Sequence, residues 1–267
     1  LAFQIGLFGP GMNNAATEGY RWVVLTYQNG RIGKTQTLQN YQRQWRTFEA
    51  GRDGLLLSNT WGDRSMNSRI NEDFIIKEAK AGAKMGVDIM QIDDGWQRGL
   101  DNAPATGGTD LWHGIWKTTD KFWLPHPKRL PKGLNPIAKA CQKLGIKMGI
   151  WYVVDSEDEY DNWRRDLARL MELHYEQGVN FFKFDGVTLS TKKSEQNFNQ
   201  LIAELLLQSK NKITIDLDVT AGVRQGYFGS LINGTLFVEN RYTDWHGYWP
   251  HQTLRNLWTL SQYIDPV

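Results

Sequence analysis

The sequence predicts an α/β protein built on a TIM-type (β/α)8 barrel, with about six β/α units visible in its 267 residues. From Gly54 onward, short apolar runs alternate with amphipathic helical patterns, and several of these patterns end at glycine. Repeated units of this kind predict a parallel sheet with right-handed crossovers. Because a closed barrel has about eight units, we expect either a barrel truncated after the sixth unit or an open, doubly wound sheet. We favour the barrel, since open sheet edges invite pairing with other chains.

Each expected strand is followed by an expected helix. The strands are expected over residues 55–61, 87–94, 146–154, 179–187, 212–219 and 235–240. The helices are expected over residues 70–85, 135–144, 162–176, 194–208, 223–231 and 251–263. Residues 97–134, between the second strand and its helix, carry three tryptophans and turn-rich ends, which indicates an ordered flap over a pocket or a plain surface excursion.

Residues 1–50 have a different pattern. Extended runs over 2–8, 20–28 and 35–45 are separated by Gly-Pro-Gly at 9–11 and by Asn29-Gly30, a hairpin signal. We therefore divide the chain into a β-rich segment over 1–50, the tail of a preceding β-rich domain, and a catalytic barrel domain over 51–267.

Composition excludes several classes of partner. Apolar residues make up 40% of the chain, charged residues 22%, and the formal net charge is +2. Lysines and arginines are interleaved with acids, so no nucleic-acid partner is expected. No apolar run approaches about 18 residues, so no membrane span is expected. The lone Cys141 excludes an internal disulfide and a cysteine-based metal cluster. Compartment and oligomeric state stay open.

Acidic and aromatic side chains gather at the ends of the expected strands. In barrels of this type the active site lies at the C-terminal ends of the strands. The candidate site residues at those ends are Trp61, Asp93, Asp94, Trp96, Trp151, Lys183, Asp185, Asp218, Arg241 and Asp244. Asp63, Asp155 and Asp216 are also expected at strand ends. A carboxylate-rich cavity with tryptophans and two cations suits a polyhydroxylated, roughly neutral substrate, because carboxylates accept hydroxyl hydrogen bonds and indole rings cover the apolar face of a sugar.

Two of these carboxylates suit the chemistry of glycosidic cleavage, which uses one ionised and one protonated carboxyl group. Lys183 and Asp185 share a strand face, because alternate side chains point the same way. Both charges need a partner or a function in a buried strand, because desolvating either is costly. The charge of Lys183 should therefore keep Asp185 ionised, as a nucleophile requires. Asp244 lies in an aromatic-rich loop where partial desolvation would raise its pKa, as a general acid requires. The alternative for Asp244 is to cap the helix beginning near Pro250.

Three motifs at successive strand ends resemble glycoside hydrolase family 36, the family of microbial α-galactosidases, whose relatives include the plant raffinose synthases. These motifs are Asn59-Thr60-Trp61, Asp93-Asp94-Gly95-Trp96-Gln97 and Lys183-Phe184-Asp185. The likeness runs from about residue 43 to residue 263. It implies cleavage of terminal α-galactosides by a retaining mechanism through a covalent glycosyl-enzyme intermediate. It also implies no metal or organic cofactor, and a β-sandwich whose end is residues 1–50.

The resemblance also assigns roles. It implies Asp185 as nucleophile, Asp244 as acid/base, and hydroxyl contacts from Asp93, Asp94, Lys183 and Arg241. It further implies Trp61 against the sugar ring and Asp218 at the position of a family cysteine, while Trp96 and Trp151 complete the expected substrate-binding set. Two departures stand out: two residues separate Arg241 from Asp244 where the family usually has three, and Gly186-Val187 replaces the usual Met-Asn-Arg after the nucleophile.

Other functions fit parts of the same pattern. An α-galactosyl transferase of the raffinose synthase kind, or another α-glycosidase, would use the same carboxylates. A metal-dependent lyase could use Asp93, Asp185 and Asp218 and would depend on a divalent metal. A Schiff-base aldolase could use Lys183, although neighbouring carboxylates should keep that lysine protonated. A non-catalytic sugar-binding fragment is the last alternative.

Overall fold

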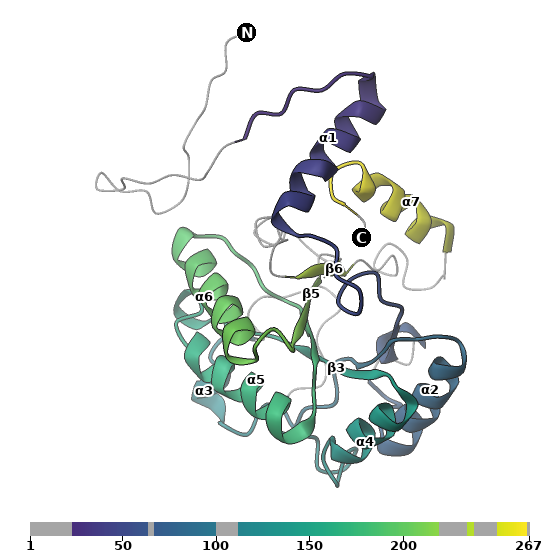
Figure 1. The fold of residues 1–267 in the computed structure, drawn as a ribbon. Coiled ribbons are helices and arrows are strands. Elements are labelled where there is room, and N and C mark those ends of the chain that lie inside the picture. Colours follow the sequence, from purple (N-terminus) through teal and green to yellow (C-terminus); the bar gives the residue numbers. More distant parts are fainter. Residues whose placement is uncertain (1–22, 64–66, 100–111, 219–233, 238–249, 266–267) are drawn as a thin grey trace.

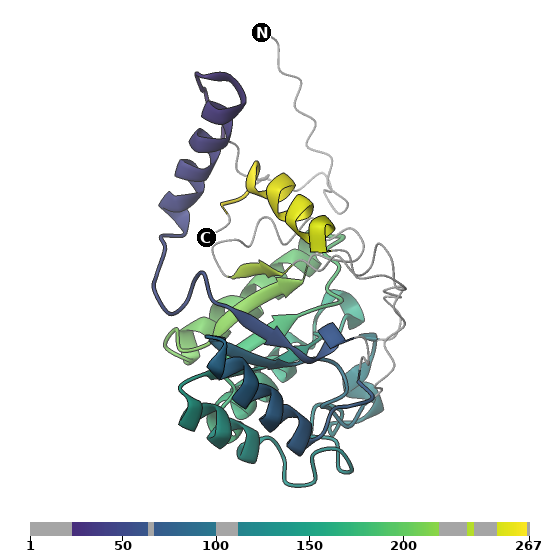
Figure 2. The same cartoon turned by 90° about the vertical axis from the view of Figure 1, so that its right-hand side faces the viewer.

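A computed structural model describes residues 23–63, 67–99, 112–218, 234–237 and 250–265. Its centre is a six-stranded, entirely parallel sheet in the order β1-β2-β3-β4-β5-β6 (Figure 1). The strands are β1 Leu57–Asn59, β2 Ile89–Ile92, β3 Lys147–Tyr152, β4 Phe181–Phe184, β5 Thr214–Asp218 and β6 Thr235–Phe237. The sheet curls into a partial barrel, and helices cover its outer face (Figures 1 and 2).

The helices follow the strands as the sequence indicates. They are α1 Gly30–Trp45, α2 Glu72–Lys84, α3 Ile115–Thr118, α4 Asn135–Leu144, α5 Trp163–Gln177, α6 Lys192–Gln208 and α7 Pro250–Ser261. Short 3-10 turns occur at η1 Thr60–Asp63 and η3 Glu157–Glu159. None of the helices in the described ranges is long and apolar enough to cross a membrane.

The predicted β/α alternation is confirmed for every unit whose residues the structure describes. Neighbouring strands are consecutive in sequence, as in a barrel, and the reversal of strand order that defines a doubly wound sheet is absent from the described strands. The expected helix over 223–231 and the end of the last expected strand, 238–240, lie outside the described residues.

Local sequence signals explain where the helices begin and end. Helix α6 begins at a capping box in which the hydroxyl of Thr191 accepts a hydrogen bond from the amide of Ser194, while the Ser194 hydroxyl accepts one from the amide of Thr191. Helix α5 ends at Gly178, whose φ of 73° is left-handed and costs a residue without a Cβ little.

The strand register decides which side chains enter the barrel. Trp151 on β3 pairs with Lys183 on β4, which pairs with Asp216 on β5. These three positions therefore share the inner face. The alternate positions, such as Phe182 and Phe184, point outward and are fully buried under the helices, where the Phe184 ring packs edge-on at 5.9 Å from Phe198 of α6. Burial of these rings is the main source of stability for the layer between sheet and helices.

The predicted strand over 35–45 is wrong, because these residues form most of helix α1. The Asn29-Gly30 pair does not turn a hairpin there: Asn29, with φ 63°, precedes the first turn of α1. Glutamine, leucine and arginine form helices readily, and tertiary contacts hold this one, since Gln39 and Gln42 donate side-chain hydrogen bonds to the carbonyls of Ser261 and Tyr263. Helices α1 and α7 consequently lie side by side (Figures 1 and 2).

The predicted strand over 20–28 is wrong for residues 23–28, which form no regular element in the structure. The expected strand over 2–8, the Gly-Pro-Gly at 9–11 and residues 20–22 lie outside the described residues. The boundary between a β-rich segment ending at 50 and a barrel beginning at 51 stays a prediction.

Candidate active site

The inner face of the sheet carries a buried cluster of charges at the carboxyl ends of β2, β4 and β5. The ammonium of Lys183 lies 3.0 Å from Asp93 Oδ2 and 3.0 Å from Asp218 Oδ2. All three side chains are almost fully buried. A buried lysine is tolerated only with such partners, because desolvation of an unpaired charge is costly. The sequence predicted that these three residues would meet at one rim, and the structure brings them together.

The end of β1 fixes Asp93 in this cluster. Asn59 donates from Nδ2 to Asp93 Oδ2 at 2.7 Å and to Gln91 Oε1 at 2.6 Å, and its own Oδ1 accepts the amide of Trp61 at 2.7 Å. The hydroxyl of Thr60 accepts the amide of Asp93 at 2.9 Å. Asn59 and Thr60 entered the sequence argument only as parts of a motif. They hold Asp93 in place because Asn59 lies opposite Gln91 in the register of β1 and β2. The periodicity of the sequence does not predict this register.

The turn after β2 orients Asp94. Gln97 donates to Asp94 Oδ1 at 2.5 Å and accepts the amide of Gly95 at 2.9 Å. Gly95 has a φ of 105°, and a Cβ there would lie 2.4 Å from the Cβ of Asn67, so only glycine fits this turn. The Asp-Asp-Gly-Trp-Gln sequence thus forms a turn that is stabilised by its own hydrogen bonds and places two adjacent carboxylates at the rim.

Trp151 holds the carboxylate of Asp185. Its indole Nε1 donates to Asp185 Oδ2 at 3.0 Å, while the amide of Gly186 donates to Asp185 Oδ1 at 2.6 Å. Trp151 is 1% exposed and Asp185 is half-buried. Both carboxylate oxygens therefore receive a donor, and hydrogen bonds of this kind favour the ionised form of a carboxyl group.

An aromatic block lies behind Trp151. The ring of Trp151 packs edge-on against Trp112 at 5.2 Å and near Trp123 at 5.9 Å, and Trp123 stacks on Tyr152 at 4.1 Å. Trp96 is fully buried, stacks on Trp123 at 6.0 Å and donates from Nε1 to the carbonyl of Trp151 at 2.7 Å. The described part of segment 97–134 is therefore ordered, and its Trp112 and Trp123 pack behind Trp151. A sugar contact for Trp96 stays a prediction; its contacts in the structure are with this block.

Asp155 pins the segment that carries Trp112 to the end of β3. Its carboxylate accepts the amides of Gly114 at 2.8 Å, Trp116 at 3.3 Å and Glu157 at 3.1 Å, and the side chain of Asn162 at 3.1 Å. The sequence places this acid at a strand end, without a predicted role. In the structure it is fully buried and serves to hold the segment over β3.

A second buried carboxyl group, Asp166 of α5, completes this network. It accepts the Tyr152 hydroxyl at 2.7 Å, the Trp116 indole at 3.2 Å and the Asp155 amide at 3.3 Å. Burial raises its pKa to about 8 despite the hydrogen bonds that it accepts. The same burial, with the neighbouring Asp166, raises the pKa of Tyr152 well above its ordinary value.

Asp216 is an interior carboxyl group that the sequence places at a strand end but that is not among the predicted site residues. It lies opposite Lys183 in the strand register, is 4% exposed, and accepts the hydroxyl of Thr235 at 3.1 Å. Burial raises its pKa to about 7, with Lys183 opposing the shift and Asp218 adding to it. The two-residue spacing from Asp218 was the available signal, because it places both side chains on one face.

Two predicted site residues, Arg241 and Asp244, lie outside the described residues. Trp61 lies buried in η1 at the end of β1. In the described ranges, no group of three or more histidine, cysteine, aspartate or glutamate side chains is arranged to hold a metal ion. The described cluster therefore combines several carboxylates, one lysine and a tryptophan wall.

A curled parallel sheet with interior carboxylates at the carboxyl ends of its strands is the arrangement of a (β/α)-barrel, in which active sites lie at those ends. No protein-family model matches this sequence. The chain is 28% identical over 135 residues to the α-galactosidase AgaA of Geobacillus stearothermophilus, covering 48% of this chain and 16% of that protein. It is 32% identical over 112 residues to an α-galactosidase of Escherichia coli, covering 42% of this chain and 13% of that protein.

Solved structures share the fold. The family 36 α-galactosidase AgaA superposes with a TM-score of 0.61 at 16% identity, covering 88% of this chain and 37% of AgaA. The α-galactosidase of Lactobacillus brevis gives a TM-score of 0.61 at 15% identity, covering 87% and 35%. This chain is therefore similar to the α-galactosidases of glycoside hydrolase family 36, as its motifs predicted, and it spans little more than a third of the length of these structures.

Proposed function

We propose that this chain provides the nucleophile-bearing and substrate-binding part of a retaining glycoside hydrolase that cleaves terminal α-galactosides. The observation that carries the proposal is the buried Asp93–Lys183–Asp218 cluster beside Asp185, at the carboxyl ends of neighbouring barrel strands. Its support from outside the chain is the sequence similarity to enzymes named α-galactosidases.

In this mechanism an ionised oxygen of Asp185 attacks the anomeric carbon and forms a covalent glycosyl ester. Asp244 donates its proton to the departing glycosidic oxygen, then removes a proton from the water that hydrolyses the ester. The hydrogen bonds from Trp151 and Gly186 hold Asp185 in place and favour its ionised form. The role of Asp244 rests on the sequence resemblance.

The interior charges suit recognition of the sugar hydroxyls. Carboxylates such as Asp93, Asp94 and Asp218 accept hydroxyl hydrogens, and the ammonium of Lys183 donates to a hydroxyl oxygen. Arg241 would add a further donor. AgaA of Geobacillus stearothermophilus has been solved in complex with raffinose and with stachyose, so α-galactosyl sucroses are the first natural substrates to test here. A sugar hydroxyl replacing water in the second step would make the same site a transferase.

The test is release of nitrophenol from para-nitrophenyl α-D-galactoside, with and without EDTA. It should use this chain and any longer polypeptide that carries it. We expect EDTA-insensitive turnover, abolished by Asp185→Asn and unaffected by Asp73→Asn, a matched change at an exposed position on α2. Product analysis with raffinose separates hydrolysis from transfer. Turnover that survives Asp185→Asn would refute the nucleophile assignment, and loss on addition of EDTA would favour the metal-dependent lyase.

Asp244 has a separate test. An Asp244→Ala variant should recover much of its rate on substrates with an activated leaving group, because such groups depart without protonation. Equal loss on activated and unactivated substrates would show that another residue is the acid.

A further inference from the structure

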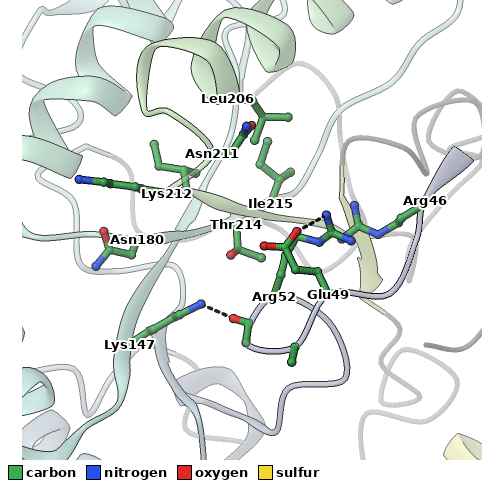
Figure 3. Close-up of a pocket in the computed structure, with 13 residues that line it drawn as sticks. Arg46, Glu49, Arg52, Lys147, Asn180, Leu206, Asn211, Lys212, Thr214 and Ile215 are labelled. Carbon is green, nitrogen blue, oxygen red and sulfur yellow. Dashed lines mark hydrogen bonds and ion pairs between the residues drawn. The ribbon is translucent and has the colours of Figure 1, made fainter.

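A cavity lies at the amino ends of β3, β4 and β5, at the opposite ends of these strands from the candidate active site. Figure 3 shows the residues that line it. Its volume is about 650 Å³, within the range of pockets that bind small molecules. Its walls are the start of β3 at Lys147, the residue before β4 at Asn180, the start of β5 at Thr214, and the loop that follows α1. Strand β5 spans roughly 15 Å, so the two sites do not touch.

Positive charge dominates the walls of this cavity. Arg46, Arg52, Lys147 and Lys212 line it, and Glu49 is the acid among its lining residues. The buried Asp53 beneath them pairs with both arginines, at 2.5 Å in each case. Even with Glu49 and Asp53 counted, the cations remain in excess.

The loop that carries the arginines is braced in place. Arg52 donates to Glu49 Oε2 at 2.9 Å and to the carbonyl of Thr47 at 2.5 Å. Burial lowers the pKa of Arg46, with Asp53 opposing that shift. A guanidinium that has lost part of its hydration is stabilised by an additional anion, because the anion replaces the lost water contacts with charge-assisted hydrogen bonds.

Lys147 faces the arginines from the other side of the cavity. Its ammonium donates to the carbonyl of Gly51 at 2.5 Å. Within the part of the chain that the structure describes, no carboxylate lies at ion-pair distance from Lys147. Its charge is therefore available to a ligand. The hydrogen bond to Gly51 holds the ammonium next to the loop that carries Arg46 and Arg52.

The remaining lining groups are suited to hydroxyls. The hydroxyl of Thr214 lies between Lys147 and the arginines, the amide of Asn180 lies on the Lys147 side, and the carboxylate of Glu49 lies on the arginine side (Figure 3). Ile213 and Ile215 add apolar surface. Arginine and lysine recognise phosphate oxygens, while amide, hydroxyl and carboxylate groups hold sugar hydroxyls.

We propose that this cavity binds a small phosphorylated sugar, with the phosphate between Lys147 and the two arginines and the hydroxyls toward Asn180, Thr214 and Glu49. This site is independent of the proposed hydrolase activity. Its ligand differs in charge from the neutral galactoside expected at the other end of the barrel.

The test is titration of the intact chain with glucose 6-phosphate, followed by calorimetry and by the phosphorus NMR shift of the probe. Inorganic phosphate and glucose are parallel probes. We expect saturable binding of glucose 6-phosphate, weaker binding of inorganic phosphate, none of glucose, and affinity that falls as sodium chloride is added. Lys147→Met should weaken binding about tenfold, the value of one charge-assisted hydrogen bond. Lys147→Arg should restore most of it.

Lys143→Met, at an exposed position on α4 outside the cavity, is the matched control and should bind as the parent does. Asn180→Ala is the second variant, since it changes only a side chain at the cavity wall and should weaken the sugar phosphate more than inorganic phosphate. Absence of saturable binding to the parent chain would overturn the proposal. Equal loss in the Lys147 and Lys143 variants, or glucose binding as tight as that of its phosphate, would also overturn it.

Discussion

The hydrogen bond from Trp151 to Asp185 gives the sharpest test of the site. Trp151→Phe keeps an aromatic ring at the same place and removes the indole N–H that lies 3.0 Å from Asp185 Oδ2. Gly186 still donates to the other oxygen. Asp185 therefore loses the indole donor and keeps the amide donor, while the backbone around it stays the same.

The size of the effect follows from the type of bond. A hydrogen bond to an ionised group contributes about 1.5–3 kcal/mol. Under the proposed function, in which Asp185 attacks the substrate, that amount sets an upper bound of about tenfold to a hundredfold on the fall in kcat/KM. Because the bond favours the ionised carboxylate, its loss also moves the acid limb of the pH–rate profile to higher pH.

The assay is the pH dependence of kcat and KM on para-nitrophenyl α-D-galactoside, with thermal unfolding measured in parallel. Trp123→Phe is the matched control, because Trp123 is fully buried in the same aromatic block and its Nε1 has no hydrogen-bond partner among the described residues. It should lower the melting temperature by a comparable amount and leave the acid limb in place. Replacing Trp151 with benzothienylalanine, which has sulfur in place of the N–H, isolates the bond without changing ring size.

Two results would refute this reasoning. One is a Trp151→Phe profile that superimposes on the parent profile. The other is an identical shift in the Trp123 control, which would assign the effect to packing and not to the hydrogen bond. An inactive parent chain would instead contradict the proposed function, so the two failures are distinguishable.

Further predictions concern residues that stabilise the fold around the candidate active site. Asp155→Asn should destabilise the fold by about 2–4 kcal/mol, because the new amide faces donors that an anion had satisfied. Hydrogen exchange should then quicken over residues 112–118, and unchanged exchange there would contradict the pinning role. Asp166→Asn should flatten the pH dependence of stability. The folded carboxyl keeps its proton up to a pKa of about 8, the unfolded one releases it near 3.8, and parental stability should therefore fall as pH rises between these values. Denaturant titrations at several pH values test this, and parallel curves for both proteins would contradict it. Gly149→Ala should cost about 1–3 kcal/mol in the same titrations, because its Cβ would lie 2.9 Å from the ring of Phe181. An unchanged denaturation midpoint would show that the Phe181 ring moves aside at no cost in stability.

The partners of the buried Lys183 could be predicted from the sequence only in part. The pattern Phe-Phe-Lys-Phe-Asp predicted that Lys183 would need partners, and strand-end logic named Asp93 and Asp218 among the candidates. It could not choose between those partners and Asp155, because the distance between residues on different strands depends on register. In the structure Lys183 forms ion pairs with Asp93 and Asp218. Asp155 instead accepts hydrogen bonds from backbone amides of segment 112–118.

By itself the sequence determined the order and type of the barrel elements, because apolar periodicity and helix-ending glycines are local signals. It also predicted that Asp93, Lys183 and Asp218 would lie at one rim, since the ends of parallel strands lie at one edge of the sheet. The tertiary structure alone decided that residues 35–45 form a helix, because contacts with Ser261 and Tyr263 lie more than 200 residues away in the chain. It alone also decided which tryptophan holds Asp185 and which tryptophans pack behind it, since a ring's neighbours are set by packing between elements that periodicity does not encode.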